Sequence, residues 1–190
     1  IAGTCEIVKP DEVPEGARVV PSFEELEADD AKLVDLFDAV REENSPSSKV
    51  LAQAHATRVV LQHPPAPPAK QEEVDRWFDL PYRREWHPDH TQRGGIAALE
   101  PVRWSVTTHR GCMADCSFCS ITFHQGRSIQ SRSEESILRE VKALAEHHDF
   151  RGTITDVGGP TANMNGLRCK LHEQGEASLQ RDCLTPAPTP

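Results

Sequence analysis

Aromatic side chains are scarce in this chain, and long apolar runs are absent. Phe, Trp and Tyr together make up 5% of the 190 residues, and apolar residues of all kinds make up 37%. No stretch approaches the roughly 20 apolar residues that a membrane-spanning helix requires, so we expect no membrane segment. Because few apolar side chains are available to offset the entropy of folding, the sequence also predicts a modest core.

The chain also lacks an excess of positive charge. It has 30 acidic residues against 21 Lys and Arg, which gives a formal net charge of −9. Nucleic acid is therefore not indicated as a partner, since binding to phosphates generally needs a basic surface. The start, "IAGTCEIVKPDE", has neither the basic segment nor the apolar core of a secretory signal. We expect a cytoplasmic protein, and a truncated one, because the chain begins without Met and both ends look cut from something longer.

Six cysteines stand out against this composition, at positions 5, 112, 116, 119, 169 and 183. An even number of cysteines would suit disulfide pairing in a secreted protein, but nothing else in the sequence indicates secretion. The central three fall within eight residues, too close together to pair efficiently among themselves. A reducing compartment and metal ligation fit this spacing better.

Residues 1–98 are expected to form an irregular, partly helical arm. The capping-box spacing of Ser22 and Glu25 predicts a helix that ends at "SPSS". A strand is expected over 56–63, followed by the extended "PPAPPA" and a short helix. Because its apolar positions are sparse, we expect the arm to lie on another surface and not to fold as an independent domain.

Residues 99–168 have the pattern of an α/β unit. A strand is predicted around "VRWSVTTHRGC", with Val102, Trp104 and Val106 on one side. A helix over 133–147 and a second strand in "GTITDVGGP" follow. Strand, helix and strand make one βαβ unit, which implies two parallel strands. The apolar stripe expected on the helix consists of Ile137, Val141, Leu144 and Ala145. Residues 169–190 form a polar segment that contains two cysteines.

The cysteine loop, "RGCMADCSFCSITFHQGR", has the spacing C-x3-C-x2-C at Cys112, Cys116 and Cys119. Zinc sites usually take four ligands, and His109 or His124 would be the nearest candidates for a fourth. A zinc-stabilised binding module is therefore one alternative. An iron-sulfur cluster is the other: three thiolates leave one iron without a protein ligand.

The motif C-x3-C-x-aromatic-C, placed directly after the first strand of a βαβ unit, resembles the radical S-adenosylmethionine (SAM) superfamily. The segments "HRGC", "ITFHQGR" and "DVGGPTANM", and "QHPPAPP" and "DLPYRREWHPDH" in the arm, are similar to the YgiQ-type family of uncharacterised radical SAM proteins. The resemblance implies an α/β fold that starts a partial (β/α) barrel, of which this chain holds about one βαβ unit. It also implies that the polar segment 169–190 is an insertion.

The resemblance implies that Cys112, Cys116 and Cys119 bind three irons of a [4Fe-4S] cluster, and that SAM chelates the fourth. One electron, from a donor such as flavodoxin or ferredoxin, would cleave SAM to a 5′-deoxyadenosyl radical. That radical would abstract hydrogen from a substrate that the resemblance does not identify. Here the cofactors carry the reaction, and the protein positions them.

Three further residues take roles from the same resemblance. Phe118 would lie near the adenine of SAM, and the backbone of Gly158 and Gly159 would meet its methionyl amino group. Pro160 stands where many members of the superfamily have an acidic residue, so backbone groups must carry more of that contact.

Several residues are left with open alternatives. Arg127 and Arg132 would either bind an anionic substrate or the SAM carboxylate, or play the structural role that is commoner near a helix start. Cys169 and Cys183 would either hold a second metal site or be ordinary cysteines. A single βαβ unit would leave much of SAM in water, so we expect the chain by itself to be a catalytically inactive fragment.

Overall fold

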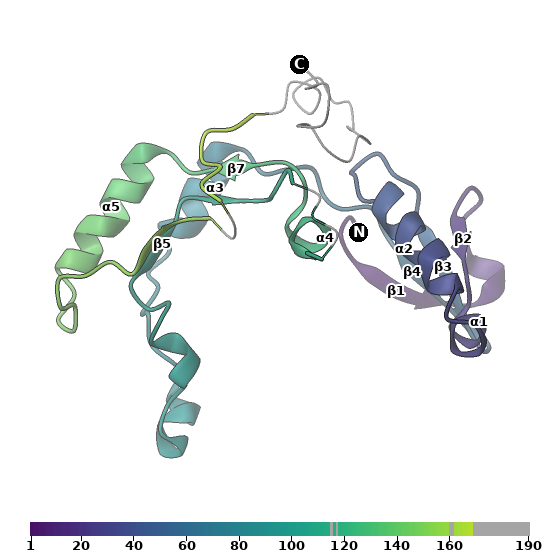
Figure 1. Cartoon of the computed structure of the whole chain (residues 1–190), viewed down its shortest axis with the longest axis horizontal. Coiled ribbons are helices and arrows are strands. Elements are labelled where there is room, and N and C mark those ends of the chain that lie inside the picture. The colour runs from purple at the N-terminus through teal and green to yellow at the C-terminus, as the bar shows by residue number, and fades with distance from the viewer. Residues whose placement is uncertain (115, 117, 160–161, 169–190) are drawn as a thin grey trace. The chain divides into compact units, whose positions relative to one another are not determined.

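The computed structural model describes residues 1–114, 116, 118–159 and 162–168 (Figure 1). These residues form a mixed α/β structure in two compact units, residues 1–67 and 68–168. The division falls in the proline-rich stretch, where the chain has no regular structure. The sequence analysis placed the boundary near residue 98 instead. The difference arises because the helix at 71–78 packs against a later helix of the second unit.

The first unit is built on a four-stranded sheet with the order β1-β4-β3-β2. The strand β2 pairs in parallel with β3, and the other two pairs are antiparallel. Two helices, α1 and α2, form the crossover between β2 and β3. An irregular arm was expected here, so the regular sheet is a correction to the sequence analysis. The elements are β1 (Cys5–Val8), β2 (Arg18–Val20), α1 (Phe23–Ala28), α2 (Lys32–Glu42), β3 (Leu51–His55) and β4 (Arg58–Gln62), with a 3-10 turn at Pro10–Glu12.

The predicted capping box at the start of α1 is present. The Glu25 N–H donates to Ser22 Oγ at 3.1 Å, and the Ser22 N–H donates to a Glu25 carboxylate oxygen at 2.9 Å. The single helix expected from this start is in fact two, because Asp29 adopts an extended backbone with φ −149° and ψ 102°. The Asp29 carboxylate then accepts the Ala31 N–H at 3.0 Å, just before α2 begins.

Small apolar clusters cover both faces of the first sheet. Leu51 packs with Val20 and Ala39 on the face that α2 covers. The next residue along the strand, Ala52, packs with Val59 and Leu61 on the opposite face. Successive side chains of a strand point to opposite faces, so β3 contributes to both clusters.

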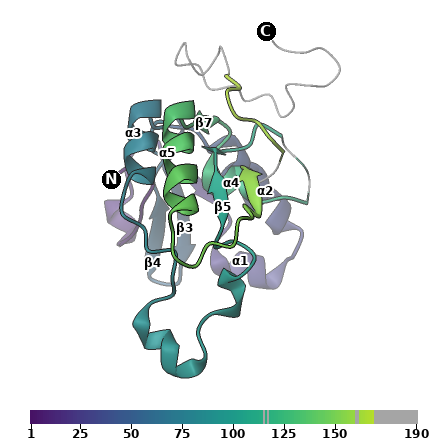
Figure 2. The same ribbon diagram turned by 90° about the vertical axis from the view of Figure 1, so that its left-hand side faces the viewer.

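The second unit contains the βαβ unit that the sequence predicted. The strands β5 and β8 pair in parallel, and α5 forms the crossover between them. A second short pair, β6 and β7, is antiparallel. The helices α3 and α5 lie side by side (Figure 2). The elements are α3 (Gln71–Phe78), β5 (Ser105–Thr107), β6 (His109–Arg110), α4 (Ile121–Gln125), β7 (Gln130–Ser131), α5 (Glu134–Ala145) and β8 (Asp156–Gly158), with 3-10 turns at Pro88–Arg93 and Ala97–Leu99.

Thr108 lies between β5 and β6, and its backbone hydrogen bonds link the two small sheets. Its N–H donates to the Gly158 carbonyl at 2.7 Å, and its carbonyl accepts the Arg132 N–H at 2.9 Å. The strand β5 is shorter than the strand that the sequence predicted around "VRWSVTTHRGC". Val102 lies before it in a turn and is exposed, whereas Val106 is buried.

The helix α5 begins one residue later than Ser133, which is its N-cap: the Ser136 N–H donates to Ser133 Oγ at 3.1 Å. Ser131 lies before the helix and pairs with His109 in the β6–β7 ladder. Of the predicted apolar stripe, Leu144 is buried and Ala145 is exposed. No helix within the described ranges has the length and apolar character needed to cross a membrane.

Candidate functional site

The cysteine loop connects β6 to β7, and hydrogen bonds close its base. The Cys112 N–H donates to the Gly126 carbonyl at 3.0 Å, and the Gly111 N–H donates to Gln125 Oε1 at 3.3 Å. Gly111 has φ +92°, and a Cβ there would lie 2.1 Å from the Ser128 carbonyl oxygen. Only glycine fits this close approach without moving the backbone. The loop is therefore anchored at the point where the cysteine motif begins.

The three loop cysteines differ in exposure. Cys112 is buried, Cys119 is half-buried and Cys116 is exposed. A turn brings the last two together, because the Cys119 N–H donates to the Cys116 carbonyl at 3.0 Å. Cys5 lies on β1 in the first unit, and none of these four described cysteines forms a disulfide. The remaining cysteines, Cys169 and Cys183, lie outside the described residues.

Phe118 is 91% exposed beside the cysteine loop. Of all the described large apolar residues, only Ile1 exposes a larger fraction of its surface. An exposed ring offers its faces to a planar ligand. The structure thus leaves Phe118 accessible for the predicted contact with adenine, which stays a prediction.

The predicted glycine turn follows β8. Gly158 is the last residue of that strand, and its carbonyl accepts the Thr108 N–H. A Cβ on Gly159 would lie 2.1 Å from Nε2 of His109, so this ring fills the space that any side chain at 159 would need. Pro160 lies outside the described residues.

His109 connects the cysteine strand to the glycine turn. Its ring is fully buried, and Nδ1 shares a hydrogen bond with Thr108 Oγ1 at 2.9 Å. Nε2 is buried without a hydrogen bond of normal geometry among the described residues. Burial lowers the pKa of His109, and the nearby Ala162 backbone acts in the opposite direction. The sequence analysis named His109 as a possible zinc ligand, whereas the structure places its ring against Gly159.

Arg132 has a structural role in this molecule. Its guanidinium is fully buried over the Phe78 ring, 4.1 Å from the ring centroid. It donates to the Thr107 carbonyl at 2.8 Å and to the Ser136 carbonyl and hydroxyl, each at 2.9 Å. It also pairs with Glu140. Of the two roles left open for Arg132, the structural one is therefore what the contacts support.

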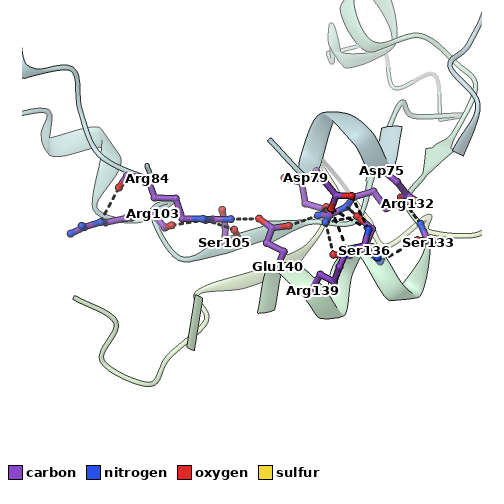
Figure 3. A network of polar contacts seen from close by, with 11 residues as sticks. Asp75, Asp79, Arg84, Arg103, Ser105, Arg132, Ser133, Ser136, Arg139 and Glu140 are labelled. Carbon is purple, nitrogen blue, oxygen red and sulfur yellow. Dashed lines mark hydrogen bonds and ion pairs between the residues drawn. The ribbon is translucent and has the colours of Figure 1, made fainter. Parts of the chain in front are cut away.

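Glu140 is shared between two arginines. One carboxylate oxygen accepts from Arg132 and the other from Arg84, so Glu140 lies between them (Figure 3). Arg84 also donates to the carbonyls of Arg103 and Ser105, at 2.7 and 3.0 Å. This network fixes the segment before β5 to α5. Sequence reasoning missed Arg84 and Glu140, because they are 56 residues apart and no local pattern relates them.

A separate group of possible metal ligands lies at the end of α5. One ligand atom each from His147, His148 and Asp149 comes within 4.8 Å of the other two. Asp149 already accepts from the Arg103 guanidinium at 2.7 Å. A positive charge so close to the carboxylate disfavours a cation there.

Comparison with known proteins decides the family. A family model described as radical SAM N-terminal matches residues 1–105, which is more than half of the chain. The chain belongs to the radical SAM N-terminal family. Membership in it confirms the resemblance to uncharacterised radical SAM proteins. The match ends before Cys112, so the roles of the loop residues stay predictions.

Curated relatives of this radical SAM chain carry the name UPF0313 protein. One from Clostridium botulinum strain 657 is 44% identical over 168 residues, which are 88% of this chain and 26% of the relative. One from Methanosarcina acetivorans is 45% identical over 195 residues, covering 99% of this chain and 26% of the relative. One from Geobacter sulfurreducens is 46% identical over 176 residues, which are 92% of this chain and 29% of the relative. The chain thus spans about a quarter of the length of these relatives. No solved structure matches it significantly.

The buried His109 makes the stability of the second unit of this radical SAM chain depend on pH. The pKa of His109 is lowered from its ordinary value of 6.5, so the unfolded chain binds a proton more readily than the folded chain. The free energy of unfolding should therefore be highest above pH 6.5 and fall as the pH drops below that value. The measurement is urea unfolding at a series of pH values, followed by the fluorescence of Trp77, Trp86 and Trp104.

The variant His109→Gln should flatten this dependence over the same pH range. His90 is exposed and serves as the matched control, because His90→Gln should leave the slope unchanged. An unaltered slope in His109→Gln would show that burial of this ring does not control the stability.

Proposed function

We propose that this chain supplies the cluster-binding loop and part of the SAM-binding surface of a radical SAM enzyme. The observation that carries the proposal is a juxtaposition at one edge of the β5–β8 pair. The strand that leads into the cysteine loop and the strand that ends at Gly158 run in parallel, so their carboxyl ends meet. Ligands of α/β proteins bind at such carboxyl ends. His109 spans the two strands there, against Gly159.

The residues present suit a [4Fe-4S] cluster. Cys112, Cys116 and Cys119 offer three thiols on one short loop, which leaves one iron open to a small ligand. A single zinc ion, at about 2.3 Å from each sulfur, would need all its sulfurs within about 4.6 Å of one another. Among the described residues these three sulfurs do not form a group with all separations within 4.8 Å. Cluster ligands bind separate irons and do not need that convergence.

Each remaining residue of the site has a positioning task. When bound, the cluster and SAM supply the electron and the 5′-deoxyadenosyl radical with which such enzymes start hydrogen abstraction. Phe118 stacks on the adenine of SAM, and the backbone of Gly158 and Gly159 receives its methionyl amino group. Because Gly159 has no side chain, the His109 ring can pack directly against this turn, whose backbone would hold the methionyl end of SAM. The strands β5 and β8 are then the first two of a partial (β/α) barrel.

We also propose a partner and a location for this enzyme. A redox enzyme of this kind draws its electron from a donor such as flavodoxin or ferredoxin. We place it in the cytoplasm, where a reducing environment keeps the thiols available to iron.

Anaerobic reconstitution of the 190-residue chain tests the proposal. With ferrous iron and sulfide, the chain should bind about four irons and four sulfides at one site. After reduction, the electron paramagnetic resonance signal should change when SAM is added, because SAM ligates the open iron. Stoichiometric zinc with no iron would refute the cluster. A cluster whose signal ignores SAM would refute the SAM site alone.

A further inference from the structure

A cavity of about 870 Å³ lies in the second unit, on the flank of the cysteine loop. The helix α3, the segment 82–85 and the strands β5 to β7 line it, together with His124 and Gln125 of α4 and Glu140 of α5. Its volume is within the range of small-molecule sites, roughly 300–1,000 Å³. Neither Phe118, Gly158, Gly159 nor any loop cysteine lines the cavity. It is therefore separate from the residues proposed to hold the cluster and SAM.

The lining of this cavity carries a net positive charge, with Arg83, Arg84 and Arg110 against Glu85 and Glu140. Of its charged lining residues, Arg84 is paired with Glu140, and Glu85 approaches the Arg103 guanidinium at 4.0 Å. Arg83 and Arg110 also line the cavity, and their side chains have no hydrogen bond or ion pair among the described residues. In a chain with a net charge of −9, two unpaired guanidiniums facing one cavity indicate a site for an anion.

Aromatic side chains form another part of the wall. Trp77 and Tyr82 line the cavity and both are exposed, so their rings are accessible to a ligand. Aromatic faces stack with nucleobases of any sequence, and arginine binds phosphate with paired hydrogen bonds. We infer that this cavity binds a nucleoside monophosphate, with its base against Trp77 or Tyr82 and its phosphate between Arg83 and Arg110.

Two polar side chains of the lining suit the same ligand. Gln130, which pairs with Arg110 in the β6–β7 ladder, and His124 both line the cavity, and amide and imidazole groups hydrogen-bond a ribose or a base edge. Gln130 also accepts the Ala69 N–H at 2.8 Å, which fixes its side chain in the wall. The ligand is thus recognised by charge at one end and by stacking at the other. This inference requires neither cluster nor SAM.

Binding of guanosine 5′-monophosphate to the metal-free 190-residue chain tests the inference, by isothermal titration calorimetry. Inorganic phosphate and guanosine should each bind more weakly than the nucleotide, because each meets only one end of the cavity. Arg83→Ala and Arg110→Ala should each weaken nucleotide binding about 10-fold, the loss of one charge-assisted contact. Tyr82→Ala should weaken binding of the nucleotide and of guanosine, and leave phosphate binding unchanged.

Arg151→Ala is the matched control, because Arg151 is an exposed arginine of the same unit outside the cavity. Nucleotide affinity should be the same as in the unaltered chain. If Arg151→Ala and Arg110→Ala lowered the nucleotide affinity equally, the loss would come from the net charge of the chain and not from the cavity, and the inference would be overturned. Displacement of the nucleotide by an equal concentration of SAM would contradict the claim that the cavity is separate from the SAM site. Absence of nucleotide binding would overturn the inference as a whole.

Discussion

Replacing Cys112, Cys116 or Cys119 with Ser should each remove essentially all bound iron from the anaerobically reconstituted chain. A cluster held by three thiolates has no spare protein ligand, and the serine hydroxyl is a poor ligand for iron that prefers thiolate. Iron and sulfide are measured per chain, together with the absorbance of the cluster. The expected change is from about four irons to nearly none in each variant.

Cys5→Ser is the control for this series. Cys5 is exposed on β1 in the first unit, so its loss should leave the iron content unchanged. Tryptophan fluorescence reports whether each variant is folded, since all three tryptophans, Trp77, Trp86 and Trp104, are in the second unit. A folded variant of the loop that keeps four irons would mean that its cysteine is not a ligand.

The parts of the fold that the sequence predicted well depend on local signals. Ser22 and Glu25, which form the predicted capping box, lie three residues apart in the sequence. The βαβ unit of β5, α5 and β8 was predicted because its helix is amphipathic and its strands are bounded by Gly residues.

The sheet of the first unit carries weaker signals. The strand β3 reads "LAQAH", which has no β-branched residue, and the turn after it uses Ala56 at φ 49° where a glycine or asparagine would be typical. The parallel pairing of Arg18 with Leu51 joins residues far apart in the sequence. Pairing over that distance depends on packing and not on local propensity, so the segment was read as an arm.

The candidate site likewise has one part that local sequence signals indicate and another that only the fold brings together. The spacing of Cys112, Cys116 and Cys119 is visible in the sequence because the three ligands are consecutive on one loop. The approach of His109 to Gly159 joins two strands that only the fold brings together. The structural role of Arg132 was one of two open alternatives, and its partners were not visible in the sequence, because Glu140 and the ring of Phe78 come from two helices.

Arg132→Ala should strongly destabilise the second unit. The Arg132 side chain is fully buried, and that of Glu140 is 14% exposed. Removing one partner of a buried ion pair leaves the other charge with less compensation, which costs about 3–5 kcal/mol. Arg84 still pairs with Glu140, so we expect the lower end of that range. Urea unfolding followed by tryptophan fluorescence measures the change.

Arg139→Ala, on α5, is the matched comparison. Arg139 pairs with Asp79 at 2.9 Å, but both side chains are about half exposed. An ion pair in that setting contributes roughly 0–1 kcal/mol. Arg132→Lys should fall between the two variants, because lysine keeps the charge but its single ammonium cannot reproduce the planar set of contacts to Thr107, Ser136 and Glu140. Equal losses from Arg132→Ala and Arg139→Ala would contradict the structural role assigned to Arg132, since burial is the property that separates the two arginines.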